Sequence, residues 1–148
     1  MSDVSDDGVP PAALVVDLDG RPFEVPRVRN LVRTWLTQAG VQRSEDVVLV
    51  VSELVANAVE HGGPTIRLAL TPVARDLLVE VADDGGGTAP HVRGGSPRRM
   101  PAPTATRGRG LALVDRLVDA LEVTGGPAGT RVRARLAGVV PPRPPDPR

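Results

Sequence analysis

The sequence of 148 residues contains no cysteine and no lysine, and Phe23 and Trp35 are its only aromatic residues. Without cysteine there can be no disulfide framework, no thiolate metal site and no cysteine nucleophile. Without lysine there can be no Walker-type phosphate loop and no Schiff-base chemistry, because both need that amine. The two histidines, His61 and His91, are too few for a histidine metal cluster. These absences exclude several enzyme classes and require an aliphatic core.

Charge and hydropathy exclude two further classes of partner. All 18 basic residues are arginine, and 18 acidic residues balance them, so the chain is not a protein whose main task is to bind nucleic acid. The most apolar run, residues 47–59, contains Ser52, Glu53 and Asn57 and is too short to cross a bilayer. The acidic N-terminus has no signal-peptide core. We therefore expect a cytoplasmic protein that contacts neither nucleic acid nor a membrane.

Composition divides the chain into one folded unit and two tails. Residues 1–11 are acidic and residues 138–148 are rich in proline, so neither can bury enough apolar surface to offset the entropy of ordering. One domain is expected at residues 12–137, long enough to bury a core without crosslinks. Within it, residues 88–107 lack periodicity and are rich in proline, glycine and arginine. A structureless loop of that length is usually functional, and here it is expected to be a lid.

Hydrophobic periodicity predicts the secondary structure and the fold class. Strands are expected at 12–17, 65–71, 76–82 and 130–136, and the middle two form an antiparallel hairpin. Helices are expected at 26–39 and 44–61, and a third begins at residue 108 with an apolar stripe of Leu111, Val114, Leu117, Val118 and Leu121. Helices grouped on one face of a mixed, mostly antiparallel sheet would bury these elements. The expected fold is therefore α+β, a two-layer α/β sandwich.

The expected helix at 44–61 carries a polar line on the side opposite its core-facing side. Glu53, Asn57 and His61 follow one another at intervals of four residues, which places them along one line, and Val50 falls in the same arc. By itself such a line is typical of a solvated helix face. The opposite arc is apolar and contains Val47, Val48, Val51, Leu54, Val55, Ala58 and Val59.

Two glycine motifs follow downstream. In Asp83-x-Gly85-x-Gly87, at a strand end, an aspartate can accept a hydrogen bond from an exocyclic amine, and the glycines let a planar ring lie against the backbone. In Gly108-x-Gly110, at a helix start, free N–H groups and the positive helix end favour phosphate. Taken alone, the first motif equally fits a turn, and the second fits a hinge or an ordinary helix start.

The order of the three motifs carries a family resemblance. Glu53-x-x-x-Asn57-x-x-x-His61-Gly62, then Asp83-x-Gly85-x-Gly87, then a loop and Gly108-x-Gly110-Leu111, resembles the ATP-binding domain shared by gyrase, Hsp90, histidine kinases and MutL, the GHKL or Bergerat fold. The resemblance covers about residues 24–137. Within this superfamily, Glu-Leu-Val-x-Asn-Ala-Val-x-His-Gly in a compact domain looks most like the anti-sigma factor serine/threonine kinases and their actinobacterial relatives, which are small ATP-binding regulators.

The resemblance implies ATP and Mg²⁺ as cofactors and a role for each matching position. Asn57 would bind Mg²⁺ through its side-chain oxygen, Glu53 would be the general base, and Asp83 would bind the adenine amine. Asp84 stands where many relatives have asparagine, so it either adds negative charge near the phosphates or faces water. The other implied nucleotide-binding positions are His61, mainly as pocket wall, Gly85, Gly87, Gly108, Gly110, Leu111 and Thr130, with Arg107 and Arg109 as cations for the phosphates.

Two activities are open on these grounds. The first is a serine/threonine kinase that sequesters a sigma factor and phosphorylates a STAS-type anti-sigma antagonist; the resemblance also suggests a homodimer. The second is a nucleotide-gated binding module without catalysis, in which ATP orders the lid. A domain that keeps the fold but binds no nucleotide is the remaining alternative.

Overall fold

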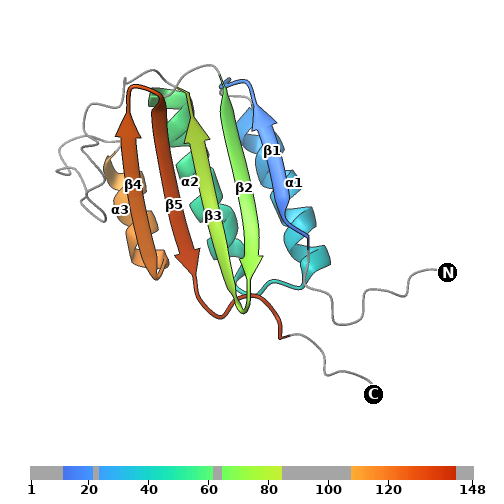
Figure 1. The fold of residues 1–148 in the computed structure, drawn as a ribbon. Coiled ribbons are helices and arrows are strands. Elements are labelled where there is room, and N and C mark those ends of the chain that lie inside the picture. The colour runs from blue at the N-terminus through green and yellow to red at the C-terminus, as the bar shows by residue number, and fades with distance from the viewer. Residues whose placement is uncertain (1–11, 22–23, 62–64, 85–107, 143–148) are drawn as a thin grey trace.

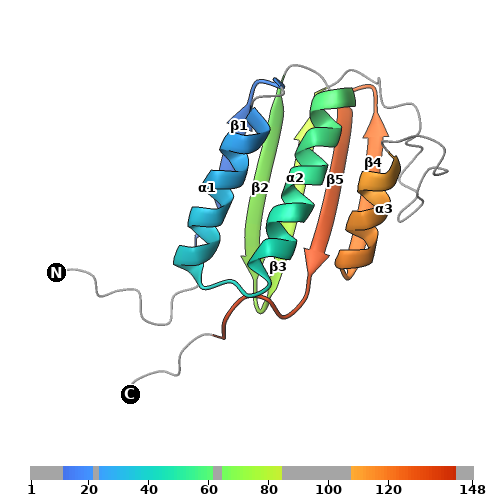
Figure 2. The ribbon, with the colours of Figure 1, turned by 180° about the vertical axis from the view of Figure 1, so that it is seen from behind.

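The computed structural model describes residues 12–21, 24–61, 65–84 and 108–142. In sequence order the described elements are β1 (Leu14–Leu18), α1 (Glu24–Ala39), α2 (Ser44–His61), β2 (Ile66–Val73), β3 (Asp76–Asp83), α3 (Gly108–Leu117), β4 (Ala120–Gly126) and β5 (Gly129–Leu136). The strands form one sheet in the order β1-β2-β3-β5-β4, and each neighbouring pair is antiparallel. The three helices lie on one face of this sheet (Figures 1 and 2). The expected α+β two-layer sandwich is confirmed.

Alternation along the strands decides which face of the sheet the helices cover. In β3 the side chains of Leu77, Val79 and Val81 are buried, whereas the residues between them are only partly covered. The opposite face carries ion pairs instead, such as Arg131 Nε with Glu80 Oε2 at 2.8 Å. Period-two alternation therefore places the aliphatic side chains under the helices and keeps charged pairs in water.

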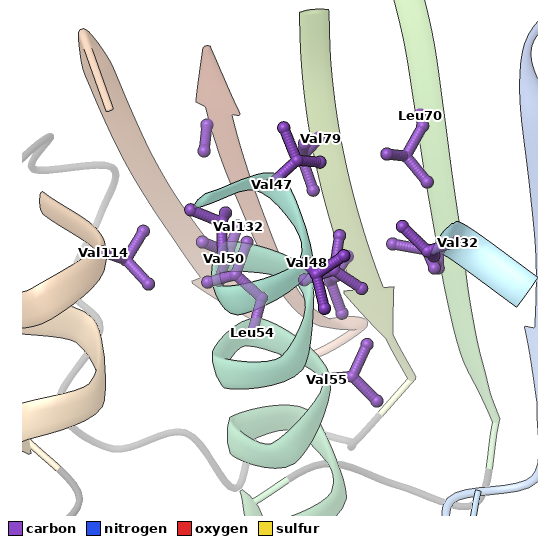
Figure 3. Packing of buried hydrophobic residues seen from close by; sticks show 14 of the residues in the cluster. Val32, Val47, Val48, Val50, Leu54, Val55, Leu70, Val79, Val114 and Val132 are labelled. Atoms are coloured by element: carbon purple, nitrogen blue, oxygen red, sulfur yellow. The ribbon is translucent and has the colours of Figure 1, made fainter. Parts of the chain in front are cut away.

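Helix α2 is the central element of the helix layer. It contacts α1, α3 and the two strands β2 and β3. Figure 3 shows Val50 and Leu54 on the side of α2 that faces Val114 of α3, and Val48 and Val55 on the side toward α1. All four of these α2 side chains are at most 3% exposed. The core around α2 is aliphatic, as the scarcity of aromatic residues requires.

The third helix is shorter than the sequence predicts, and a strand was missed. The apolar stripe was expected to continue in helical form to Leu121, but α3 ends at Leu117 and β4 begins at Ala120. After the helix, the backbone N–H of Asp119 donates to the carbonyl of Arg135 in β5 at 2.8 Å, which begins the β4–β5 pairing. Leu121 and Val123 are then buried at alternate positions. Leu121 satisfies both periodicities, so the apolar pattern alone could not separate helix from strand.

The packed unit also extends further toward the C-terminus than expected. Val139 and Val140 are 1% and 2% exposed, although the tail was expected to begin at residue 138. Their carbonyls accept hydrogen bonds from the backbone N–H of Gln42 at 2.7 Å and from Arg75 Nε at 2.8 Å. These bonds tie the segment to the α1–α2 and β2–β3 connections. Residues 1–11 and 143–148 lie outside the described residues, so the two tails remain predictions there.

Within the described ranges, none of the helices combines the length and the apolar character needed to span a bilayer.

Candidate nucleotide site

Elements that carry the sequence motifs converge at one end of the sandwich, the upper end in Figures 1 and 2. There α2 ends at His61, β3 ends at Asp83, α3 begins at Gly108 and β5 begins at Gly129. These four positions are far apart in the sequence. The antiparallel sheet and the helix layer bring their elements to the same end, and the candidate site lies there.

Asp83 and Thr130 are neighbours across two strands. They are register partners in the β3–β5 ladder, so their Cβ atoms lie within about 4.5–5.5 Å of one another. Asp83 lies two residues after the buried Val81 in β3, and Thr130 lies two residues before the buried Val132 in β5, so both project from the helix-covered face. Both side chains are partly exposed. A hollow of about 230 Å³ lies beside them and is lined by Ala82, Asp83, Thr124, Gly125, Ala128, Gly129, Thr130 and Arg131.

Glu53 and Asn57 do not lie on the solvent-exposed face of α2. Both are half-buried, whereas Ala56 and Glu60 on the same helix are exposed. Val50, which was expected in the same polar arc, is fully buried because α3 packs against that side of the helix. Asn57 follows Val50 by seven residues and so returns to within about 20° of the same direction. Asn57 therefore lies on the α3-facing side of α2, and Glu53 precedes it by one turn of the helix.

The first turn of α3 is built from Gly108, Arg109 and Gly110. The first N–H groups of a helix have no partner within it, and the helix dipole adds partial positive charge there. Leu111, which was expected to bind nucleotide, is 5% exposed and belongs to the core, so it anchors this turn to the sandwich. Of the remaining predicted positions, Gly85, Gly87, Arg107 and the lid at 88–107 lie outside the described residues.

The end of β3 is held on one side by hydrogen bonds to Thr65 and on the other by a close backbone approach of Gly129. The backbone N–H of Asp84 donates to the carbonyl of Thr65 at 3.3 Å, and the backbone N–H of Thr65 donates to Asp84 Oδ1 at 3.2 Å. On the other side Gly129 has a φ of +129°, and a Cβ there would lie 1.9 Å from the carbonyl oxygen of Asp83. Neither contact was expected from the sequence. A glycine inside a strand pattern indicates a close backbone approach, but only the register identifies its partner.

A larger hollow of about 460 Å³ lies along α1, away from the motifs. None of the predicted site residues that the structure describes lines it. The lining consists of Leu14, Arg27, Asn30, Leu31, Thr34, Trp35 and Gln38.

Comparison with known proteins identifies the family of this chain. Residues 18–136 match the family of histidine kinase-like ATPase domains, which is most of the chain and includes the whole sheet apart from part of β1. The chain belongs to this family. The resemblance drawn from the motif order is thereby confirmed at the level of the GHKL fold, and family membership supports ATP binding by this histidine kinase-like ATPase domain.

Solved structures agree on the fold. The crystal structure of the RsbU and RsbW domains of Rv1364c from Mycobacterium tuberculosis is 26% identical in sequence, with a TM-score of 0.64, and the match covers 90% of this chain. It covers only 34% of that protein, so the histidine kinase-like ATPase domain spans about a third of it. The mycobacterial sensor histidine kinase MprB is 18% identical, with a TM-score of 0.51, over 88% of this chain and 100% of that one. This second likeness shows the fold alone.

Proposed function

We propose that this histidine kinase-like ATPase domain is an ATP-binding regulator that acts as an anti-sigma factor serine/threonine kinase. The observation that carries the proposal is the half-burial of Glu53 and Asn57 on the α3-facing side of α2, in a sandwich whose Asp83 and Thr130 are cross-strand partners. A surface helix without function would instead turn such polar residues to solvent.

The residues present fit ATP and Mg²⁺. The carboxamide oxygen of Asn57 is a hard ligand of the kind that Mg²⁺ takes, and Mg²⁺ usually keeps several waters besides its few protein ligands. The carboxylate of Asp83 is an acceptor suited to an adenine amine, and the missing Cβ of Gly129 lets the start of β5 lie against the backbone of Asp83. The first turn of α3 offers phosphate the backbone N–H groups that have no acceptor within the helix. When bound, ATP supplies the γ-phosphoryl group, and Mg²⁺ neutralises charge on the phosphates.

Glu53 is the proposed general base. It lies one helical turn before Asn57 on the same side of α2, so one rigid helix positions both groups. Its carboxylate would accept the proton of the attacking serine or threonine hydroxyl as the bond from that oxygen to the γ-phosphorus forms and the bond from the γ-phosphorus to the bridging oxygen breaks, with ADP as the leaving group. Thr130 would add a polar contact near the adenine, and His61, the last residue of α2, would form part of the pocket wall. Gly85, Gly87, Arg107, Arg109 and the lid at 88–107 complete the proposed site.

Similarity to a protein that contains an RsbW domain supports the anti-sigma branch of the family. The partners proposed on that basis are a sigma factor and a STAS-type antagonist with an acceptor serine or threonine. A homodimer is part of the same proposal.

The test is phosphoryl transfer from radiolabelled ATP to a STAS-type antagonist from the same genome. Wild-type protein with Mg²⁺ should label the antagonist, and Glu53→Gln should lower the rate at least 100-fold while ATP still binds. Glu60→Gln is the matched control, because Glu60 has the same charge on the same helix but is exposed. It should behave as wild type. An antagonist that binds but is never labelled, with regulation intact in Glu53→Gln, would favour the nucleotide-gated module instead.

A further inference from the structure

The pairing of β2 with β3 ends in an unusual pair of opposite residues, called here a rung of the ladder. Ile66 and Asp83 are register partners, so Thr65 and Asp84 stand opposite one another at the next position. In a regular hydrogen-bonded pair of an antiparallel ladder, the two residues exchange two backbone hydrogen bonds. Here the backbone N–H of Asp84 donates to Thr65 as expected, but the return bond from Thr65 ends on the carboxylate oxygen Oδ1 of Asp84. The side chain thus completes a rung that the main chain of Asp84 leaves incomplete.

This rung bears directly on the direction of the Asp83 side chain. Asp83 is the last residue of β3 and is paired on both sides, with Ile66 and with Thr130. Because side chains alternate along a strand, a slip of one residue there would turn the carboxylate of Asp83 to the opposite face of the sheet. The Asp84–Thr65 rung lies immediately beyond this last pair and closes the ladder on the β2 side.

Gly129 closes the ladder on the other side. The missing Cβ lets the start of β5 lie against the Asp83 carbonyl, where a methyl group would be 1.9 Å from that oxygen. The backbone of Asp83 is therefore held between β2 and β5. Neither interpretation considered for Asp84 from the sequence, added charge near the phosphates or simple exposure to water, includes this bond.

We infer that Asp84 is a positioning residue for nucleotide selectivity: its carboxylate oxygen, bonded to Thr65, fixes the face and register at which Asp83 meets the exocyclic amine of adenine. The inference rests on the proposed nucleotide site. What matters is the acceptor oxygen and not the negative charge, so asparagine at this position serves equally well. Because the bond is exposed, its loss costs little global stability, and its effect appears in base selectivity. Guanine carries an oxygen where adenine carries the amine, so a displaced Asp83 loses its preference for adenine.

The experiment compares wild type, Asp84→Asn, Asp84→Ala and Thr65→Pro by titration with ATP and with GTP in the presence of Mg²⁺. Thr65→Pro removes the N–H donor and leaves the carboxylate in place, which separates the bond from the charge. Circular dichroism verifies that each variant is folded at the temperature of the titration. Hydrogen exchange at the Thr65 amide reports the bond itself in all but the proline variant.

Wild type and Asp84→Asn should bind ATP with the same affinity and the same preference over GTP. In Asp84→Ala and Thr65→Pro the ratio of ATP to GTP affinity should fall about tenfold, and Thr65 should exchange faster in Asp84→Ala. An unchanged ratio in Asp84→Ala, or a fall of equal size in Asp84→Asn, would overturn the inference while the proposed site stands. Wild-type protein that binds no ATP would overturn the proposed function, and the inference with it.

Discussion

Three glycines offer a graded test of how closely β5 approaches the end of β3. Gly126, Gly129 and Gly138 all lie in or beside the β4–β5 region, but their surroundings differ. At Gly126 a Cβ would meet nothing within 4 Å, and no unusual φ is present. Gly138 also has open space, but its φ is +72°. Gly129 combines a φ of +129° with the contact to Asp83. Alanine therefore adds no strain at Gly126 and backbone strain at Gly138. At Gly129 it adds backbone strain together with a steric overlap.

The expected losses of unfolding free energy follow from these differences. Gly126→Ala should be neutral or stabilising by up to about 1 kcal/mol, because alanine restricts the unfolded chain. Gly138→Ala should cost about 1–2 kcal/mol, the penalty of a left-handed conformation for a residue with a Cβ. Gly129→Ala adds to a similar strain a displacement of backbone against backbone, and overpacking of this kind costs about 1–3 kcal/mol more. The total for Gly129→Ala is therefore about 2–5 kcal/mol, a large part of a typical domain stability of about 5–15 kcal/mol.

Urea denaturation followed by circular dichroism measures all three variants against wild type. The midpoint should fall in the order Gly126→Ala, Gly138→Ala, Gly129→Ala, with the slope unchanged. Gly129→Ala should also weaken ATP binding, since it pushes on the carbonyl of Asp83, whereas Gly126→Ala should not. If Gly129→Ala costs no more than Gly138→Ala, the close approach of β5 to Asp83 is refuted.

Two further predictions concern the rest of the fold. Hydrogen bonds from the backbone N–H of Gly138 and, second, from the guanidinium of Arg135 lower the pKa of Asp76 in the folded protein. The ionised carboxylate therefore stabilises the fold at pH values above the unfolded pKa of about 3.9, and this contribution is lost as the pH falls through the lowered folded pKa. Asp76→Ala should therefore be less stable than wild type near neutral pH, with a difference that shrinks in acid; a difference that urea denaturation finds constant down to about pH 2.5 would contradict this. Leu54→Ala empties a fully buried position between the sheet and α3 and should cost about 2–5 kcal/mol. Leu113→Ala, at a position 38% exposed on α3, is its control and should cost less than about 1 kcal/mol in the same assay, so equal losses would show that Leu54 is not a core residue.

Much of the fold could be predicted because most of its elements have an unambiguous period. The hairpin at Ile66–Val73 and Asp76–Asp83, the helix ending at His61 and the last strand all follow from periodicity and glycine punctuation. β4 escaped prediction because Leu121 suits both a helical stripe and a strand. Val139 and Val140 read as part of a proline-rich tail, since only tertiary contacts with Gln42 and Arg75 reveal that they are buried.

The candidate site was predictable as a set of residues but not as an arrangement. Motif order singled out Glu53, Asn57 and Asp83, because each residue type has a chemical reason to be there. The cross-strand pairing of Asp83 with Thr130 depends on the strand order, in which β5 lies between β3 and β4. Sequence spacing contains no information on that order. The bond from Thr65 to Asp84 depends further on the register of β2 against β3, and therefore became visible only in the folded structure.

The measurement that tests the central claim most directly is calorimetric titration of ATP into wild type and Asn57→Ala, each with and without Mg²⁺. Wild type should bind ATP more tightly with Mg²⁺ than without it, and Asn57→Ala should lose this Mg²⁺ dependence while its unfolding midpoint stays close to that of wild type, because Asn57 is only half-buried. Wild-type protein that binds no ATP in either condition, or an Asn57→Ala variant with an unchanged response to Mg²⁺, would contradict the proposed nucleotide site.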